Sequence, residues 1–201
     1  MQRVITHLCI ILIINTLNVQ SQDRVSKFTP DVRPERIILT IKSDPSSSMA
    51  VTWRTDTSVS VTRAQIVPDN PSTFLADSAE TFSGEYTDVH GDGIVSRYHS
   101  VNFTGLRPES TYLYRVGSDL SWSEWFEFKT ASKTNKQFSF IYFGDSQVRD
   151  KSLWTRVIRS AFTNNSKAAF TLFAGDLVDG GDGNTLQDEE WGEWHEGGSF
   201  I

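Results

Sequence analysis

Two aspartates in matching contexts are the residues of this chain best suited to chemistry. Asp145 and Asp176 each follow a glycine that closes a short apolar run, residues 138–143 and 168–174. Two carboxylates brought together repel and raise each other's pKa unless a cation lies between them. Hard oxygen ligands on a rigid scaffold suit a divalent or trivalent metal ion. The alternative is that each aspartate only caps a helix or shapes a turn, but the repeated pattern favours a metal site.

The elements that would position these aspartates can be read from the same stretch. Runs of aromatic and β-branched residues closed by glycine predict two strands that are buried on both faces. Between them, apolar residues recur four apart in two series and predict a helix with one broad apolar side: Leu153, Val157 and Ala161, then Trp154, Ile158 and Phe162. Strand, helix and strand within about 30 residues form a βαβ unit with parallel strands. Ligands bind at the carboxyl ends of such strands, so Asp145 and Asp176 are expected on one edge.

A second helix is predicted near the C-terminus. Thr185 with Asp188 three residues later is a capping box, and Trp191 and Trp194 fall on one helix face. His195 lies beside Trp194 on this helix, where a capping or surface role is favoured over metal ligation.

The part of the chain from residue 34 to residue 130 has a different pattern. Short alternating runs are separated by clusters of proline, glycine, serine and aspartate, which predicts a β-sandwich; the runs are residues 36–42, 49–55, 62–68, 98–104, 111–117 and 124–130. Trp53 is the predicted core tryptophan. Tyr112 resembles the tyrosine corner of fibronectin type III domains, in which the hydroxyl bonds back to the preceding turn. Residues 131–137 are polar and are interpreted as a linker.

Three features of this region admit a functional alternative. The His90-Gly-Asp92-Gly stretch is interpreted as a glycine-rich loop between strands rather than a metal site, and His99 as a structural residue on a strand. Five aromatic residues could form a sugar-binding face, although a sandwich also buries such residues: Tyr98, Tyr112, Tyr114, Trp122 and Trp125.

Composition and the N-terminal sequence limit the partners and the cellular location that can be expected. The 201 residues carry a formal charge of -6, which argues against a nucleic-acid partner. Residues 1–21 combine Arg3, a broken apolar run and small residues near Ser21, as in a secretory signal peptide; the alternative is an uncleaved anchor. Cys9 lies in this segment, so the mature chain is expected to be secreted, without a disulfide and without a membrane span. Asn102 and Asn164 begin glycosylation sequons.

Two motifs and one longer segment carry a family resemblance. The FGDSQ and AGDLVDGGD stretches resemble the first two blocks of the calcineurin-like metallophosphoesterases, and residues 34–130 resemble the N-terminal domain of purple acid phosphatases. The implied fold is a mainly β, fibronectin III-like sandwich followed by an incomplete α/β metallophosphoesterase domain at 138–201. By this resemblance, Asp145 is a terminal metal ligand and Asp176 bridges two metal ions.

The sequence departs from the family pattern at two positions. Gln147 replaces a glycine, and it could offer a side-chain oxygen to metal or lie outside the ligand shell. Asp179 stands where purple acid phosphatases have a tyrosine ligand. Because the colour comes from charge transfer between tyrosinate and iron, the protein is expected not to be purple. The later Gly-Asn-His and histidine motifs do not appear before Ile201, so half of a two-metal site is present.

The resemblance implies the N-terminal portion of a secreted, metal-dependent phosphatase. The complete enzyme would hold two ions of iron, zinc or manganese about 3.5–4 Å apart and hydrolyse phosphomonoesters with a metal-bound hydroxide. Its substrate would be a phosphorylated small molecule or a phosphoprotein, and this fragment is expected to be inactive. The alternative is a non-catalytic secreted binding module with a degenerate hydrolase remnant. Oligomeric state cannot be predicted from these residues.

Overall fold

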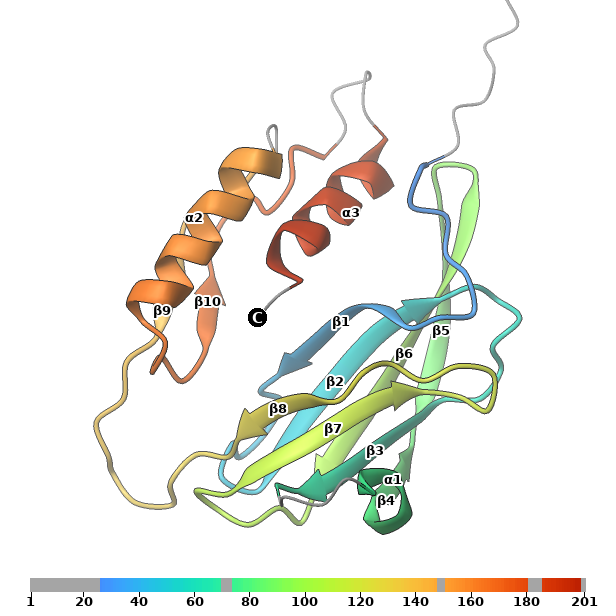
Figure 1. Ribbon diagram of the computed structural model, residues 1–201. Coiled ribbons are helices and arrows are strands. Elements are labelled where there is room, and N and C mark those ends of the chain that lie inside the picture. The colour runs from blue at the N-terminus through green and yellow to red at the C-terminus, as the bar shows by residue number, and fades with distance from the viewer. Residues whose placement is uncertain (1–25, 70–73, 148–150, 181–185, 200–201) are drawn as a thin grey trace, which may run out of the picture.

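The computed structural model describes residues 26–69, 74–147, 151–180 and 186–199 (Figure 1). The predicted signal peptide, with Cys9, lies outside these residues. Two four-stranded antiparallel sheets form the N-terminal part, and a two-stranded parallel sheet with two helices forms the C-terminal part.

The N-terminal sheets confirm the predicted β-sandwich. One sheet has the order β1-β2-β6-β5 and the other the order β4-β3-β7-β8. Their bounds are β1 Glu35–Thr40, β2 Ser48–Thr55, β3 Arg63–Pro68, β4 Glu80–Ser83, β5 Glu85–Gly91, β6 Ile94–Thr104, β7 Thr111–Gly117 and β8 Phe126–Lys129, with a short helix α1 at Leu75–Ser78. All six predicted strands are present. The sequence did not predict β4, β5 or α1, and every residue of β5 is exposed, so that strand lacks the apolar alternation on which the prediction rests.

Alternating apolar side chains from both sheets make the core. Trp53 is fully buried in it, together with Val101 and Phe103 from the neighbouring strand. The Tyr112 hydroxyl accepts a hydrogen bond from the backbone N–H of Arg107 at 2.9 Å. This bond ties the turn before β7 to the strand, so both the core tryptophan and the tyrosine corner are confirmed.

The glycine-rich loop predicted after His90 is present as the Asp92-Gly93 turn, and His99 is a structural strand residue, as predicted. Asp92 and Gly93 have φ angles of 51° and 73° in the tight turn between β5 and β6, a conformation that favours such Asp-Gly pairs. His99 is buried, with its ring nitrogens 2.8 Å from the Thr55 hydroxyl and 2.7 Å from the Thr62 hydroxyl. Its ring also stacks on Trp53 at 5.0 Å. Burial lowers the His99 pKa to about 4, with a smaller contribution from the nearby Arg97 charge.

The predicted βαβ unit is present, with shorter strands than the apolar runs suggested. Strands β9 (Ile141–Phe143) and β10 (Thr171–Phe173) pair in parallel, and α2 (Lys151–Asn164) connects them. The prediction that both faces of these strands are buried is wrong, because the helices cover one face only. Tyr142 and Leu172 are 60% and 45% exposed, whereas Phe143 packs against Trp154 of α2.

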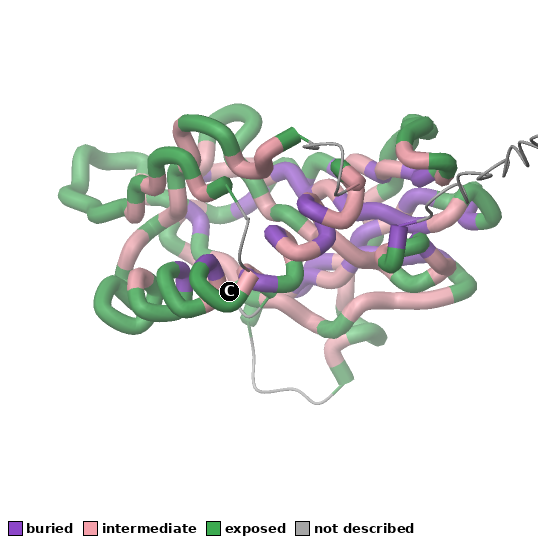
Figure 2. Tube along the Cα trace, turned by 90° about the horizontal axis from the view of Figure 1, so that it is seen from above, coloured by how far each residue is buried: buried purple, intermediate pink, exposed green. Residues whose placement is uncertain are grey.

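Only part of the predicted apolar side of α2 is buried. Trp154 and Ile158 are buried, while Leu153, Val157 and Phe162 are more than 40% exposed. Figure 2 shows the same contrast along the trace, with most of α2 exposed and buried positions gathered in the sandwich and in α3. No helix among the described residues is long and apolar enough to cross a membrane.

Helix α3 (Gln187–Gly198) lies between the βαβ unit and the sandwich (Figure 1). Trp191 and Trp194 share one face, with ring centroids 6.0 Å apart, as predicted. Thr185 of the predicted capping box lies outside the described residues. The helix follows Leu186 without a side-chain cap, and the Asp188 carboxylate contacts two arginines instead of the helix start.

Candidate metal-binding site

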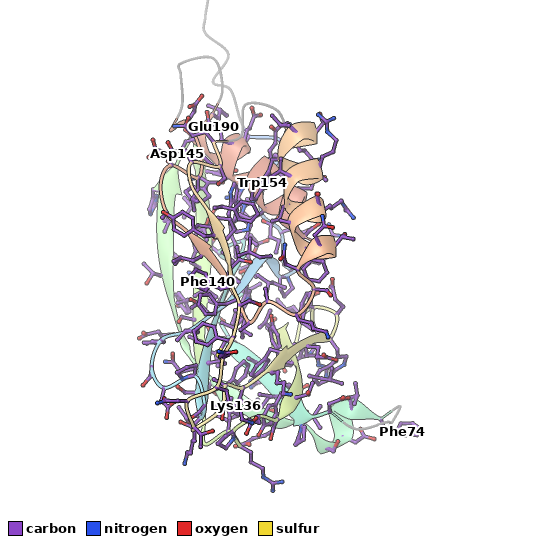
Figure 3. All side chains as sticks on the ribbon, turned by 90° about the vertical axis from the view of Figure 1, so that its left-hand side faces the viewer. Phe74, Lys136, Phe140, Asp145, Trp154 and Glu190 are labelled. Atoms are coloured by element: carbon purple, nitrogen blue, oxygen red, sulfur yellow. The ribbon has the colours of Figure 1, made fainter. Side chains whose placement is uncertain are left out.

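The structure brings Asp145 and Asp176 together at the carboxyl ends of β9 and β10. The backbone N–H of Asp176 donates a hydrogen bond to Asp145 Oδ1 at 3.3 Å. The Gln147 amide Nε2 donates to Asp176 Oδ2 at 3.0 Å. Parallel pairing causes this convergence, since Phe143 and Phe173 are partners in the sheet and the aspartates follow them closely. All three side chains belong to exposed residues, and Asp145 lies at one end of the molecule (Figure 3).

The glycine before Asp176 has a steric role in this convergence. Gly175 has a φ of 117°, and a Cβ atom built on it would lie 1.9 Å from Asp145 Oδ1. A side chain at 175 would therefore displace the carboxylate as well as strain the backbone. A Cβ atom on Gly144 would meet nothing within 4 Å. Of the two matched glycines, only Gly175 is required by the approach of the two loops.

Asp179 lies further along the second loop, which α3 holds in place. The N–H of the next residue, Gly180, donates to Glu190 Oε2 at 2.8 Å. Glu190 is only 4% exposed. Asp179 itself is half-exposed, and its predicted role as a weaker ligand stays a prediction.

Ser146, between the first aspartate and Gln147, is also held by α3. The Trp194 indole Nε1 donates to Ser146 Oγ at 3.1 Å. Sequence reasoning missed Ser146, Gly175 and Glu190 as parts of the site and assigned Trp194 only to a helix face. The one sequence signal for Trp194 is its indole N–H, which needs an acceptor when the ring is buried.

The neighbouring histidine belongs to the aromatic cluster of α3. The His195 ring lies 5.0 Å from the Trp194 ring and 6.2 Å from the Trp191 ring. Burial, together with smaller effects of the Arg36 and Arg54 charges, lowers the His195 pKa to about 4. The imidazole is therefore neutral at pH 7, and its contacts are with indole rings.

The donor chemistry of the aspartate pair fits a divalent cation. Carboxylates are hard oxygen ligands. Asp145 Oδ1 accepts the Asp176 N–H and lies close enough to Gly175 to exclude a side chain between the loops. The described residues contain no cluster of three or more histidine, cysteine or acidic side chains suited to a metal. The role of the pair as metal ligands stays a prediction. Gln147 donates its amide to Asp176, an arrangement that favours its role outside the ligand shell.

Four of the five aromatic residues considered for sugar binding divide into two structural groups, and the fifth, Tyr98, accepts a hydrogen bond from Arg36 Nη1 at 3.5 Å. Tyr112 and Tyr114 are buried in the sandwich core. Trp122 and Trp125 stack on the Arg115 guanidinium, whose central carbon lies 4.6 and 4.8 Å from their ring centroids. Cation–π stacking of this kind accounts for the two tryptophans without a ligand.

The predicted glycosylation sequons lie at accessible positions. Asn102 is exposed on β6, opposite Ala50 of β2, and Asn164 is exposed at the end of α2. The Asn164 amide donates to the Ser160 carbonyl at 2.8 Å. Modification of either asparagine stays a prediction.

Comparison with known proteins identifies the sandwich. Residues 34–130 match the family model described as the purple acid phosphatase N-terminal domain. The match supports the purple acid phosphatase family, and it covers the segment that folds as the two antiparallel sheets. No curated protein matches the chain.

Two solved structures are similar to part of this chain. A computer-based redesign of a β-sandwich protein is 20% identical, with a TM-score of 0.33, and the match covers 51% of this chain and 97% of that one. Astrotactin-2, described as a perforin-like membrane protein involved in neuronal development, is 15% identical, with a TM-score of 0.37. That match covers 65% of this chain and 29% of astrotactin-2, so this chain spans less than a third of its length.

Proposed function

We propose that this chain is the N-terminal portion of a secreted, metal-dependent phosphatase of the purple acid phosphatase family. The observation that carries the proposal is the meeting of Asp145 and Asp176 at the carboxyl ends of two parallel strands, beside a sandwich that matches the family's N-terminal domain. In this proposal residues 138–201 are the first part of an α/β metallophosphoesterase domain. Residues 131–137 are the linker, and residues 1–21 direct secretion.

The roles of the chain's own residues follow from their positions. Asp145 and Asp176 would hold iron, zinc or manganese ions, with Asp179 at the rim. When bound, such ions supply Lewis acidity and activate water for attack on a phosphomonoester. Gly175 keeps the two loops in contact, and Gln147 orients the Asp176 carboxylate through its amide. The substrate class is a phosphorylated small molecule or a phosphoprotein.

Metal titration tests this proposal. We expect Mn²⁺ or Zn²⁺ to bind the purified chain in a calorimetric titration, and we expect Asp145→Asn and Asp176→Asn each to weaken that binding. The described residues contain no group of three or more histidine, cysteine or acidic side chains suited to a metal, so we expect this chain alone not to hydrolyse p-nitrophenyl phosphate. The metal site would be refuted if the wild-type chain bound neither ion. It would also be refuted if both variants bound metal as tightly as the wild-type chain.

A non-catalytic binding module is the second candidate. The Gln147 amide favours it, because it occupies one oxygen of Asp176 that a bridging ligand would use. Gln147→Gly restores the family pattern and releases this oxygen. If neither the wild-type chain nor the Gln147→Gly variant binds metal, the non-catalytic alternative is the better description.

A further inference from the structure

Helix α3 contacts both aspartate loops and the sandwich. We propose that α3 positions these loops, with Trp194 and Glu190 as the positioning residues and Asp188 as the anchor on the sandwich. The inference rests on the proposed metal function, which it deepens by assigning the support of the ligands to a named helix. It also gives the sandwich a role in the site, beyond lying next to it.

The first loop is held by an indole whose direction is fixed. Trp194 is 9% exposed and stacks on Trp154, with ring centroids 5.9 Å apart. Its ring also meets the edge of Phe173 at 5.1 Å. With the ring enclosed in this way, its N–H has one direction, toward Ser146 Oγ. Because Ser146 follows Asp145 directly, the bond restricts where that carboxylate can lie.

The second loop is held one helical turn earlier. Glu190 Oε2 accepts the Gly180 N–H at 2.8 Å, in the loop that begins at Asp176. Glu190 and Trp194 are four residues apart, so they lie on one helix face. In Figure 3, Glu190 and Asp145 lie at the same end of the molecule. A single rigid helix face therefore sets the spacing between the two aspartate loops.

The helix itself is fixed to the sandwich through Asp188. Its carboxylate lies 2.6 Å from Arg54 Nη1 and 2.8 Å from Arg36 Nη1, and it accepts the Ser26 hydroxyl at 2.7 Å. Its backbone N–H donates to Asp92 in the β5–β6 turn at 2.7 Å. These contacts come from four places, namely the segment before β1, β1, β2 and the β5–β6 turn, so the start of α3 cannot shift without breaking several of them.

Close packing along α3 prevents it from rotating or sliding. A Cβ atom on Gly192 would lie 2.2 Å from the Phe28 ring, on the sandwich side. A Cβ atom on Gly197 would lie 2.4 Å from the Trp154 ring, on the α2 side. The helix is thus held between the two parts of the chain. Groups that orient metal ligands typically change metal affinity 10–100-fold when removed.

Two variants on the same helix provide a matched test. Trp194→Phe keeps an aromatic ring but removes the donor to Ser146. Glu193→Gln weakens a contact of α3 with Lys27, at 2.6 Å, that does not involve the loop. We expect Trp194→Phe to accelerate amide hydrogen exchange in residues 144–147 and to weaken Mn²⁺ binding about 10-fold. Glu193→Gln should leave the exchange of those amides unchanged.

Ser146→Ala removes the acceptor without altering α3, so it decides the question if Trp194→Phe does not fold. It should reproduce the faster exchange of residues 144–147. In the second loop, Glu190→Ala should accelerate amide exchange at Gly180. Glu190→Gln keeps an acceptor oxygen, so it should leave that exchange at the slow wild-type rate.

The outcomes separate this inference from the proposed function. If wild-type exchange and Mn²⁺ affinity persist in both Trp194→Phe and Ser146→Ala, the positioning role is refuted although the metal site stands. If the wild-type chain binds neither Mn²⁺ nor Zn²⁺, the proposed metal function is refuted. Exchange at residues 144–147 still decides whether α3 holds the loop.

Discussion

The Asp188 contact with two arginines offers the most decisive test of how the chain is assembled. The Arg54 side chain is fully buried and that of Arg36 is 4% exposed, and both guanidinium groups share the Asp188 carboxylate. Asp188→Ala would leave two buried cations with Glu35 as the neighbouring carboxylate, 2.6 Å from Arg54. The Glu35 pKa is already raised by burial, with an opposing effect from the Arg54 charge.

The expected loss of stability follows from this burial. Removing one partner of a buried ion pair costs about 3–5 kcal/mol, because the remaining charge is left uncompensated. The Asp188 side chain is 13% exposed and Glu35 remains beside Arg54, so we expect about 3 kcal/mol, at the low end of that range. Asp188→Asn keeps oxygen and loses charge, and its effect should be intermediate.

A neighbouring ion pair on the same helix is the control. Glu193 pairs with Lys27 at 2.6 Å, with side chains 27% and 57% exposed. Glu193→Ala should therefore lower the free energy of unfolding by about 1 kcal/mol or less. Both variants would be measured by urea denaturation followed by tryptophan fluorescence, which reports on all six tryptophans of the chain, Trp191 and Trp194 of α3 among them. Added salt should weaken the Glu193 contribution more than that of Asp188.

Equal losses in the two variants would refute the reasoning. In that case the apolar contacts of α3 would hold it on the sandwich, and the arginine cluster would contribute little. A loss near 3 kcal/mol that coincides with faster exchange in residues 144–147 would link the anchor to the aspartate loop.

Three further predictions concern single sites. Gly175→Ala should lower the free energy of unfolding by about 1–3 kcal/mol through backbone strain, and it should weaken metal binding by displacing Asp145. Gly144→Ala should change neither quantity. Thermal melts measure the stability, and calorimetric titration measures the metal binding. Because the folded His99 pKa is about 4 against a usual value of 6.5, the contribution of neutral His99 to the free energy of unfolding should be fully present above pH 6.5. It should fall by at most about 3 kcal/mol as the pH drops from 6.5 to 4, and a His99→Gln variant should lack this part of the pH dependence in urea denaturation. Tyr112→Phe should cost about 1 kcal/mol by leaving a backbone N–H without its acceptor, and no loss in a thermal melt would contradict that role.

The sequence predicted the sandwich and the meeting point of the aspartates for physical reasons. Alternating apolar residues with glycine and proline breaks specify half-buried strands, and Trp53 and Tyr112 occupy the expected places. Parallel strands must bring their carboxyl ends to one edge, so Asp145 and Asp176 meet as predicted. The sequence did not predict β5, because its residues are all exposed and show no apolar alternation. Backbone pairing with β6 holds this strand in the sheet.

Sequence alone determined the local periods, the strand–helix–strand order and the residues at the strand ends, because these depend on neighbours along the chain. The tertiary structure decided which faces are covered: Tyr142 and Leu172 are exposed although their runs are apolar, since a run of apolar residues does not specify how many layers pack on it. It also decided how α3 is used. The bond from Trp194 to Ser146 spans 48 residues and that from Arg54 to Asp188 spans 134. Partners so distant are chosen by the packing of whole elements, which no local pattern encodes.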